Sequence, residues 1–188
     1  MTASVNSRLA VILALQVAAG CSRPSPQGGA PAQGPAAPAP SEYLLSAEPP
    51  GARDVADVRK SARADEAVVV VGRVGGEVKD FDPLAYMDRN PWVEGKAAFL
   101  IADTSLVPCN ARAGDNCPTP WDYCCDNDVL KDSRLMVKLV DRDGQSLPAD
   151  ARTLLGLKEL QTVVVRGRAE RDESGNVTIL ASGLFVRP

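Results

Sequence analysis

The sequence has no histidine and few aromatic side chains. Without imidazole, Ser-His-Asp and Cys-His catalysis, imidazole general bases and every imidazole-dependent metal site are excluded. The 188 residues include three Phe, three Tyr and two Trp, fewer than a platform for stacked nucleic-acid bases normally uses. Lys and Arg number 21 against 24 Asp and Glu, for a formal net charge of −3, so a surface for polyanions is not expected. Length and a hydrophobic content of 45% fit one globular domain with extra segments.

Residues 1–20 have the pattern of a secretory signal. Arg8 is the one charged side chain before an uncharged, largely apolar run over residues 9–20, which is too short to span a bilayer as a helix. The run ends in small residues immediately before Cys21, in the sequence VAAGC. This ending resembles the lipobox of bacterial lipoproteins. The resemblance implies lipidation of Cys21, a membrane contact through that lipid, and a cell-envelope location facing the periplasm or exterior.

Two other interpretations of the N-terminus stay open, namely plain secretion with an incidental Cys21 and an uncleaved anchor. The following segment favours the lipid anchor. Residues 22–40 contain six Pro, five Ala and three Gly without apolar periodicity, which is typical of an extended tether. We therefore expect a signal peptide at 1–20, a lipidated cysteine and tether at 21–50, a short helix at 51–64 and a folded domain at 65–188.

The folded domain is expected to be mainly β. Runs rich in Val, Ile and Leu, bounded by Gly and Asp, predict five strands, and Leu residues at helical spacing predict a helix over 149–160. The strands are expected at 67–76, 97–103, 134–140, 162–171 and 176–187. Glycine within the first strand indicates a bend or bulge.

The resulting order is three strands, one helix and two strands. This pattern resembles the OB-fold, a five-stranded Greek-key barrel, with a short helix between the third and fourth strands. It is similar to envelope-located bacterial OB proteins without assigned activity. Another small β-barrel or an open meander are the alternatives.

A long insertion between the second and third strands, residues 104–133, carries the remaining cysteines: Cys109, Cys117, Cys124 and Cys125. An even number of cysteines in an exported chain predicts disulfides. Adjacent cysteines rarely bond each other, which leaves two pairings, either Cys109–Cys124 with Cys117–Cys125 or Cys109–Cys125 with Cys117–Cys124. Each bond is expected to contribute roughly 3 kcal/mol by the chain-entropy model.

Two other uses of these cysteines are alternatives to the disulfides. Four thiolates could hold zinc tetrahedrally, but the loop contains no Cys-x₂-Cys knuckle. A redox-active Cys124–Cys125 pair lacks the Cys-x-x-Cys spacing that lowers a thiol pKa. We therefore expect no metal and no cofactor. The acidic residues of the loop are expected to be solvated, because they lack the register of a Ca²⁺-binding loop.

The function expected from these features is a non-enzymatic, lipid-anchored envelope module that binds an envelope protein or a small ligand. OB barrels bind through strands two and three and the adjacent loops, so Trp121, Tyr123 and Arg112 of the cysteine loop are the candidate binding residues. The two aromatic residues could instead pack as a local core beneath the loop. Alternative functions are oligonucleotide binding and cysteine-based metal or redox chemistry. Residues 65–188 carry 15 Lys and Arg against 20 Asp and Glu, so nucleic acid is not expected as a partner.

Overall fold

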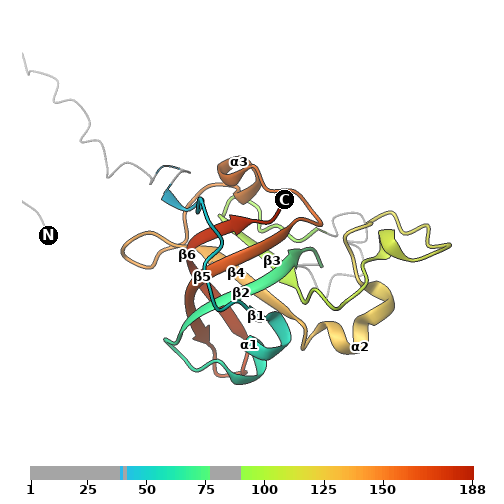
Figure 1. The fold of residues 1–188 in the computed structure, drawn as a ribbon, viewed down its shortest axis with the longest axis horizontal. Helices are drawn as coiled ribbons and strands as arrows, with labels where there is room; N and C mark the ends of the chain where they lie inside the picture. The colour runs from blue at the N-terminus through green and yellow to red at the C-terminus, as the bar shows by residue number, and fades with distance from the viewer. Residues whose placement is uncertain (1–38, 40–41, 77–89) are drawn as a thin grey trace, which may run out of the picture. The chain divides into compact units, whose positions relative to one another are not determined.

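A computed structural model describes residues 39, 42–76 and 90–188. The predicted signal peptide, Cys21 and most of the tether lie outside the described residues. The elements, in chain order, are β1 (Arg53–Asp54), α1 (Val55–Ser61), β2 (Ala67–Val74), β3 (Ala98–Ala102), α2 (Asn127–Leu130), β4 (Arg134–Leu139), α3 (Ala151–Leu155), β5 (Thr162–Arg171) and β6 (Val177–Val186). The predicted helix at 51–64 corresponds to α1 (Figure 1).

Five of the strands form a closed barrel. The order around it is β2-β3-β4-β6-β5, and pairing between β5 and β2 closes the circle. All neighbours are antiparallel except β4 and β6, which run parallel. The two-residue strand β1 adds to β2 in parallel. This is the OB-like topology that the sequence predicts, with α3 between the third and fourth barrel strands, so the predicted fold class is confirmed.

Gly72 allows β2 to take part in both halves of the barrel. Residues 67–73 of β2 pair with β5, whereas Arg73 and Val74 pair with β3. A Cβ at Gly72 would lie 2.9 Å from the Ile101 Cβ and 3.0 Å from the Val55 Cγ2. The absence of a side chain therefore lets β3 and α1 approach the strand where it changes partners.

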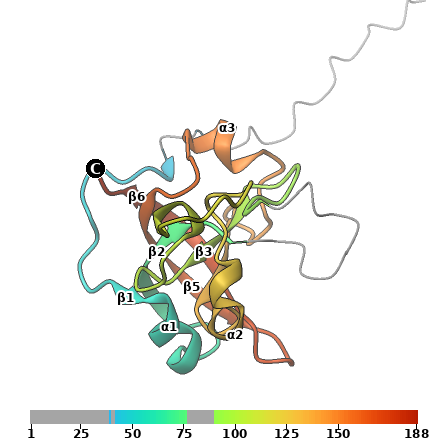
Figure 2. The same cartoon turned by 90° about the vertical axis from the view of Figure 1, so that its right-hand side faces the viewer.

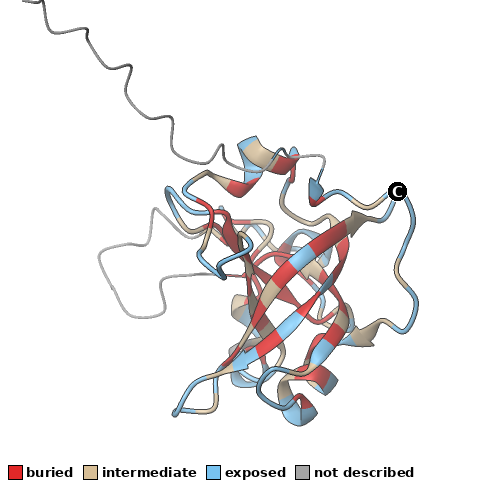
Figure 3. Cartoon of the chain, turned by 90° about the vertical axis from the view of Figure 1, so that its left-hand side faces the viewer, coloured by how far each residue is buried: buried red, intermediate tan, exposed pale blue. Residues whose placement is uncertain are grey.

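The strands separate a core face from an outer face. β4 alternates between half-buried and buried residues, whereas all five residues of β3 are buried. Figure 3 shows the same alternation as red and pale segments along the strands. The largest fully buried side chains of the main core are Phe99, Ile101, Leu135, Leu139, Ile179 and Leu184. Burial of these side chains is the dominant stabilisation of the barrel, because each contributes about 1.5–3 kcal/mol when removed from water.

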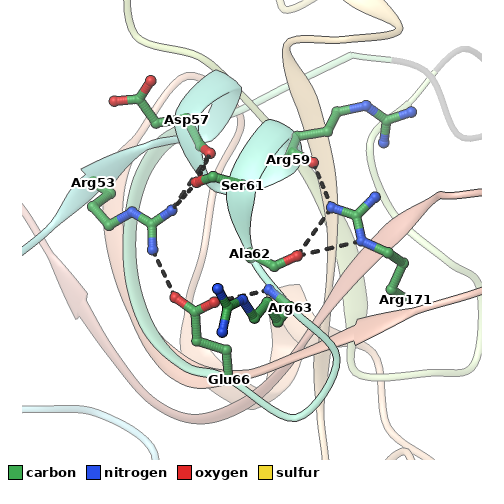
Figure 4. A network of polar contacts seen from close by, with 8 residues as sticks. All are labelled: Arg53, Asp57, Arg59, Ser61, Ala62, Arg63, Glu66 and Arg171. Carbon is green, nitrogen blue, oxygen red and sulfur yellow. Dashed lines mark hydrogen bonds and ion pairs between the residues drawn. The ribbon is translucent and has the colours of Figure 1, made fainter.

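Arg171 of β5 attaches α1 to the barrel. Its Nη2 donates to the carbonyl oxygens of Arg59 at 2.8 Å and Ala62 at 3.0 Å, where the helix ends. These carbonyls lack partners within the helix, so the guanidinium acts as a C-terminal cap. An ion pair between Arg53 and Glu66, 2.9 Å apart, links the segment before α1 to the segment after it (Figure 4).

Helix α3 is shorter than the predicted 149–160. It begins after Asp150, whose carboxylate accepts a hydrogen bond from the Arg152 backbone N–H at 2.9 Å. It ends at Leu155, because Gly156 adopts a left-handed conformation with φ of 67°. Leu157, which the sequence places in the helix, enters the core from the loop that follows. No helix among the described residues combines the length and apolar character needed to cross a membrane.

Candidate functional site

The cysteine loop, residues 104–133, connects β3 to β4, contains α2 and lies beside the barrel (Figures 1 and 2). Asp103 fixes its start. One carboxylate oxygen accepts the backbone N–H of Ala56 in the first turn of α1 at 2.9 Å, and the other accepts the N–H and hydroxyl of Ser105. Burial opposes the charge on Asp103, but these hydrogen bonds outweigh it and hold the pKa below its usual value. The carboxylate therefore caps α1 from a distant part of the chain.

A second contact holds the loop against the end of β2. The Gly76 N–H donates to the Trp121 carbonyl oxygen at 3.0 Å. A Cβ at Gly75 would lie 2.7 Å from that oxygen and 3.1 Å from Cε2 of Tyr123. Tyr123 is fully buried and forms a small apolar cluster with Ala102 and Leu130. The two glycines thus allow close backbone contact between loop and barrel.

Within the loop, two segments run beside each other. The N–H of Cys109 donates to the Asp122 carbonyl oxygen at 2.9 Å, and the N–H of Asn110 donates to the Pro120 carbonyl oxygen at 3.1 Å. Short 3-10 turns cover Cys109–Ala111 and Cys124–Asp126. This pairing brings the first cysteine of the loop next to the third. An ion pair between Arg112 and Asp126 connects the two turns.

The four loop cysteines converge but are not bonded. All four are free thiols, and Cys109 Sγ lies 3.4 Å from Cys124 Sγ, well beyond the disulfide bond length of about 2.05 Å. The two disulfides predicted from the sequence are therefore not formed in this structure. Cys117 Sγ instead contacts the Thr119 hydroxyl at 3.2 Å.

Two groups of potential ligand atoms overlap at Cys109. The thiols of Cys109, Cys117 and Cys124 lie within 4.8 Å of one another, and so do the ligand atoms of Cys109, Asp115 and Cys125. Cys109 is 1% exposed, whereas Cys125 is exposed. The loop therefore centres its thiols on one buried sulfur, an arrangement that the spacing of cysteines in the sequence does not reveal.

The environments of these thiols differ. Burial raises the pKa of Cys109, and the hydrogen-bonded contact with Cys124 adds to that effect. Burial also raises the pKa of Cys124. Hydrogen bonds from Thr119 lower the pKa of Cys117. Among these three, Cys117 is thus the thiol whose surroundings favour the thiolate.

The predicted binding residues occupy three different settings. Tyr123 is buried, so it belongs to the local core that the sequence allowed as an alternative to a contact patch. Trp121 is half-buried, and its carbonyl oxygen accepts the N–H of Gly76, just after the end of β2. Arg112 is half-buried and ion-paired with Asp126, and the hydrogen bond with Asp126 raises the pKa of its guanidinium. Thiolate forms of Cys125 and Cys109 would raise that pKa further. Arg112 is therefore an electrostatic neighbour of the thiols.

The sequence gives no signal for a groove at the other end of the β3–β4 hairpin. This groove has a volume of about 300 Å³ and is lined by residues of β3, β4, β5 and β6 and of the adjacent loops. Met136 and Leu180 contribute apolar surface, and Lys138 forms an ion pair with Glu170 at 3.7 Å. The hydroxyl of Ser146, also in the lining, is buried and has no hydrogen-bond partner among the described residues. Its lining residues come from several strands, so only the register between those strands reveals it.

No protein-family model matches the chain, and no curated protein matches it.

Proposed function

We propose that this chain is a lipid-anchored protein of the cell envelope, facing the periplasm or exterior, whose OB-like barrel is a non-enzymatic binding module. The signal-like run before Cys21 and the Pro-rich tether behind it support the anchor. The closed barrel supports the binding module.

The observation that carries the binding role is the groove on the β3–β4 face. OB barrels commonly bind ligands on this face, and about 300 Å³ is at the lower end of the volumes of small-ligand sites. Apolar surface from Met136 and Leu180 lies beside the charged pair Lys138 and Glu170. This chemistry suits a small amphipathic ligand or one projecting side chain of an envelope protein. The unpartnered Ser146 hydroxyl offers it a hydrogen bond.

The anchor is tested by Cys21→Ser in the full chain. The wild type is expected in the detergent phase of a detergent–water partition, and the variant in the aqueous phase, because lipidation supplies the membrane affinity. Equal partition of the two forms into detergent contradicts the anchor.

The groove is tested with a photo-crosslinking amino acid placed at Met136 in cells. The matched control carries it at Ser182, an exposed position on β6 outside the groove. Mass spectrometry is expected to find a discrete adduct at Met136 and none at Ser182. The same adducts at both positions, or none at Met136, argue against the groove as the ligand site.

Oligonucleotide binding is the competing function for an OB barrel. With 15 Lys and Arg against 20 Asp and Glu over residues 65–188, the domain repels phosphates. We expect no binding of a single-stranded oligonucleotide at physiological salt. Binding that weakens steeply with added salt would establish the opposite.

A further inference from the structure

The cysteine loop holds three thiols around one point. The Sγ atoms of Cys109, Cys117 and Cys124 are all within 4.8 Å of one another, and the Cys109–Cys124 pair is 3.4 Å apart. Zn²⁺ binds thiolate sulfur at about 2.3 Å, which places two sulfurs of a tetrahedral site about 3.8 Å apart. A disulfide would use two of these three thiols and leave the third. A single metal ion would use all three.

Two of these cysteines are held by contacts outside the sulfur cluster. Cys109 donates its N–H to the Asp122 carbonyl oxygen, and Cys117 donates its N–H to Oδ1 of Asp115 at 2.8 Å. Thr119 contacts the Cys117 sulfur at 3.2 Å. Such surrounding hydrogen bonds orient metal ligands before the ion binds.

Arg112 supplies an independent observation. Its Nε is buried and has no hydrogen-bond partner among the described residues. Its guanidinium pairs with Asp126, which is the main cause of its raised pKa, and thiolate forms of Cys125 and Cys109 would raise that pKa further. Three thiolates around one dication leave a net charge of −1, and an adjacent guanidinium would compensate it. The positive charge of Arg112 therefore favours the ionised cluster over the neutral thiols.

We propose that Cys109, Cys117 and Cys124 form a three-thiolate site for a thiophilic dication such as Zn²⁺. The second group, which shares Cys109, offers the Asp115 carboxylate for the fourth position and Cys125 as a peripheral thiol. Bound metal replaces the thiol protons, so apparent affinity rises with pH. This site is independent of the groove and of the lipid anchor.

The test uses the full chain in detergent, reduced, stripped of metal by a chelator and titrated with Co²⁺. We expect one equivalent to produce a thiolate-to-cobalt charge-transfer band with the visible bands of tetrahedral coordination, and one equivalent of Zn²⁺ to remove them. Cys117→Ser is expected to weaken Co²⁺ binding by at least about 100-fold, because it removes a ligand. Arg112→Gln is expected to weaken it by about 10- to 100-fold, as loss of an outer partner does.

Cys125→Ser is the matched control. It removes one thiol of the same loop but none of the proposed three, so the band and the affinity are expected to stay within a few-fold of wild type. Asp115→Asn reports on the fourth position, and an unchanged spectrum assigns that position to solvent while retaining the three-thiolate site.

Two spectroscopic results overturn the proposal. One is a spectrum that depends on Cys125 but not on Cys117. The other is the absence of a band from the reduced protein. Intact mass measured before reduction distinguishes the protein with two disulfides from the protein with four thiols, because two disulfides remove four hydrogens. Protein isolated under anaerobic conditions with that deficit and without zinc would establish the predicted disulfides instead of the metal site.

Discussion

The two ends of the β3–β4 hairpin are stabilised differently. At one end, Ala98 pairs with Lys138, and the side chains beneath belong to the main barrel core. At the other end, Ala102 pairs with Arg134 and the chain opens into the cysteine loop. The apolar cluster there is small and centred on Tyr123. The loop is held mainly by polar contacts.

Because of this difference, the barrel core determines the stability of the domain, whereas the loop carries the candidate thiol site. Removal of the loop contacts leaves the strands with their own apolar core, whereas loss of the core leaves no platform for the loop. Local opening of a segment with few apolar contacts requires less free energy than global unfolding. We therefore expect substitutions in the barrel core to lower the free energy of unfolding of the whole domain. Substitutions at the loop contacts are expected to change mainly the exposure of the thiols.

The largest effect is expected from Phe99→Ala. Phe99 is fully buried in the core and its ring lies 5.6 Å from that of Trp92. The substitution is expected to lower the free energy of unfolding by about 3–5 kcal/mol, because it removes apolar contacts and leaves a cavity. Urea denaturation followed by far-ultraviolet circular dichroism measures it. A loss below about 1 kcal/mol would show that the barrel core is not the main source of stability.

Gly75→Ala is expected to have a smaller effect, located in the loop. The new Cβ would meet the Trp121 carbonyl oxygen at 2.7 Å, so the loop must move away from β2. We expect a loss of about 1–3 kcal/mol, as in other overpacked sites, and much faster alkylation of Cys109, which is 1% exposed in the structure. The control is Ser182→Ala on the exposed face of β6. Unchanged alkylation in Gly75→Ala would mean that the loop does not depend on this contact.

Local patterns in the sequence were sufficient to locate the five strands of the barrel. The β-branched run of residues 162–171 coincides with β5, and Gly72 lies where β2 changes partners. These features depend on strand periodicity and on backbone sterics, which a single segment reveals. Gly156 also carried the signal that ends α3, although the Leu spacing suggested a longer helix.

The site was much less predictable, because its geometry comes from residues far apart in the chain. The sequence located the cysteines but not the shared position of Cys109 in both ligand groups. Tyr123 lies against Gly75, just after the end of β2 and far earlier in the chain. The groove requires the register of β3, β4 and β6. No local propensity encodes these contacts.

Asp103→Asn tests the connection between the loop and α1. The pKa of Asp103 is below its usual value of 3.8 because hydrogen bonds from Ala56 and Ser105 outweigh the effect of burial. The ionised carboxylate therefore stabilises the fold above about pH 3.8, and this contribution is lost as pH falls through the lowered pKa. We expect the variant to be less stable at pH 7 by about 1–2 kcal/mol.

The difference between wild type and Asp103→Asn is expected to shrink in acid below that pH. Asp132→Asn is the control, since Asp132 is 74% exposed and lies 3.9 Å from Arg59. A difference between wild type and Asp103→Asn that is independent of pH would mean that the carboxylate acts by shape and not by charge.

The smallest effect, of opposite sign, is expected from Ser146→Ala in the groove. Ser146 Oγ is buried without a partner among the described residues, so its removal ends an uncompensated desolvation and is expected to raise the free energy of unfolding by about 0.5–1 kcal/mol. Ser105→Ala provides the contrast, because Ser105 Oγ donates to Asp103 at 2.7 Å and its loss is expected to destabilise the protein by about 1 kcal/mol. Thermal and urea unfolding of both variants measure the two signs. If Ser146→Ala destabilises the protein as Ser105→Ala does, the hydroxyl already has a structural partner and is not reserved for a ligand of the groove.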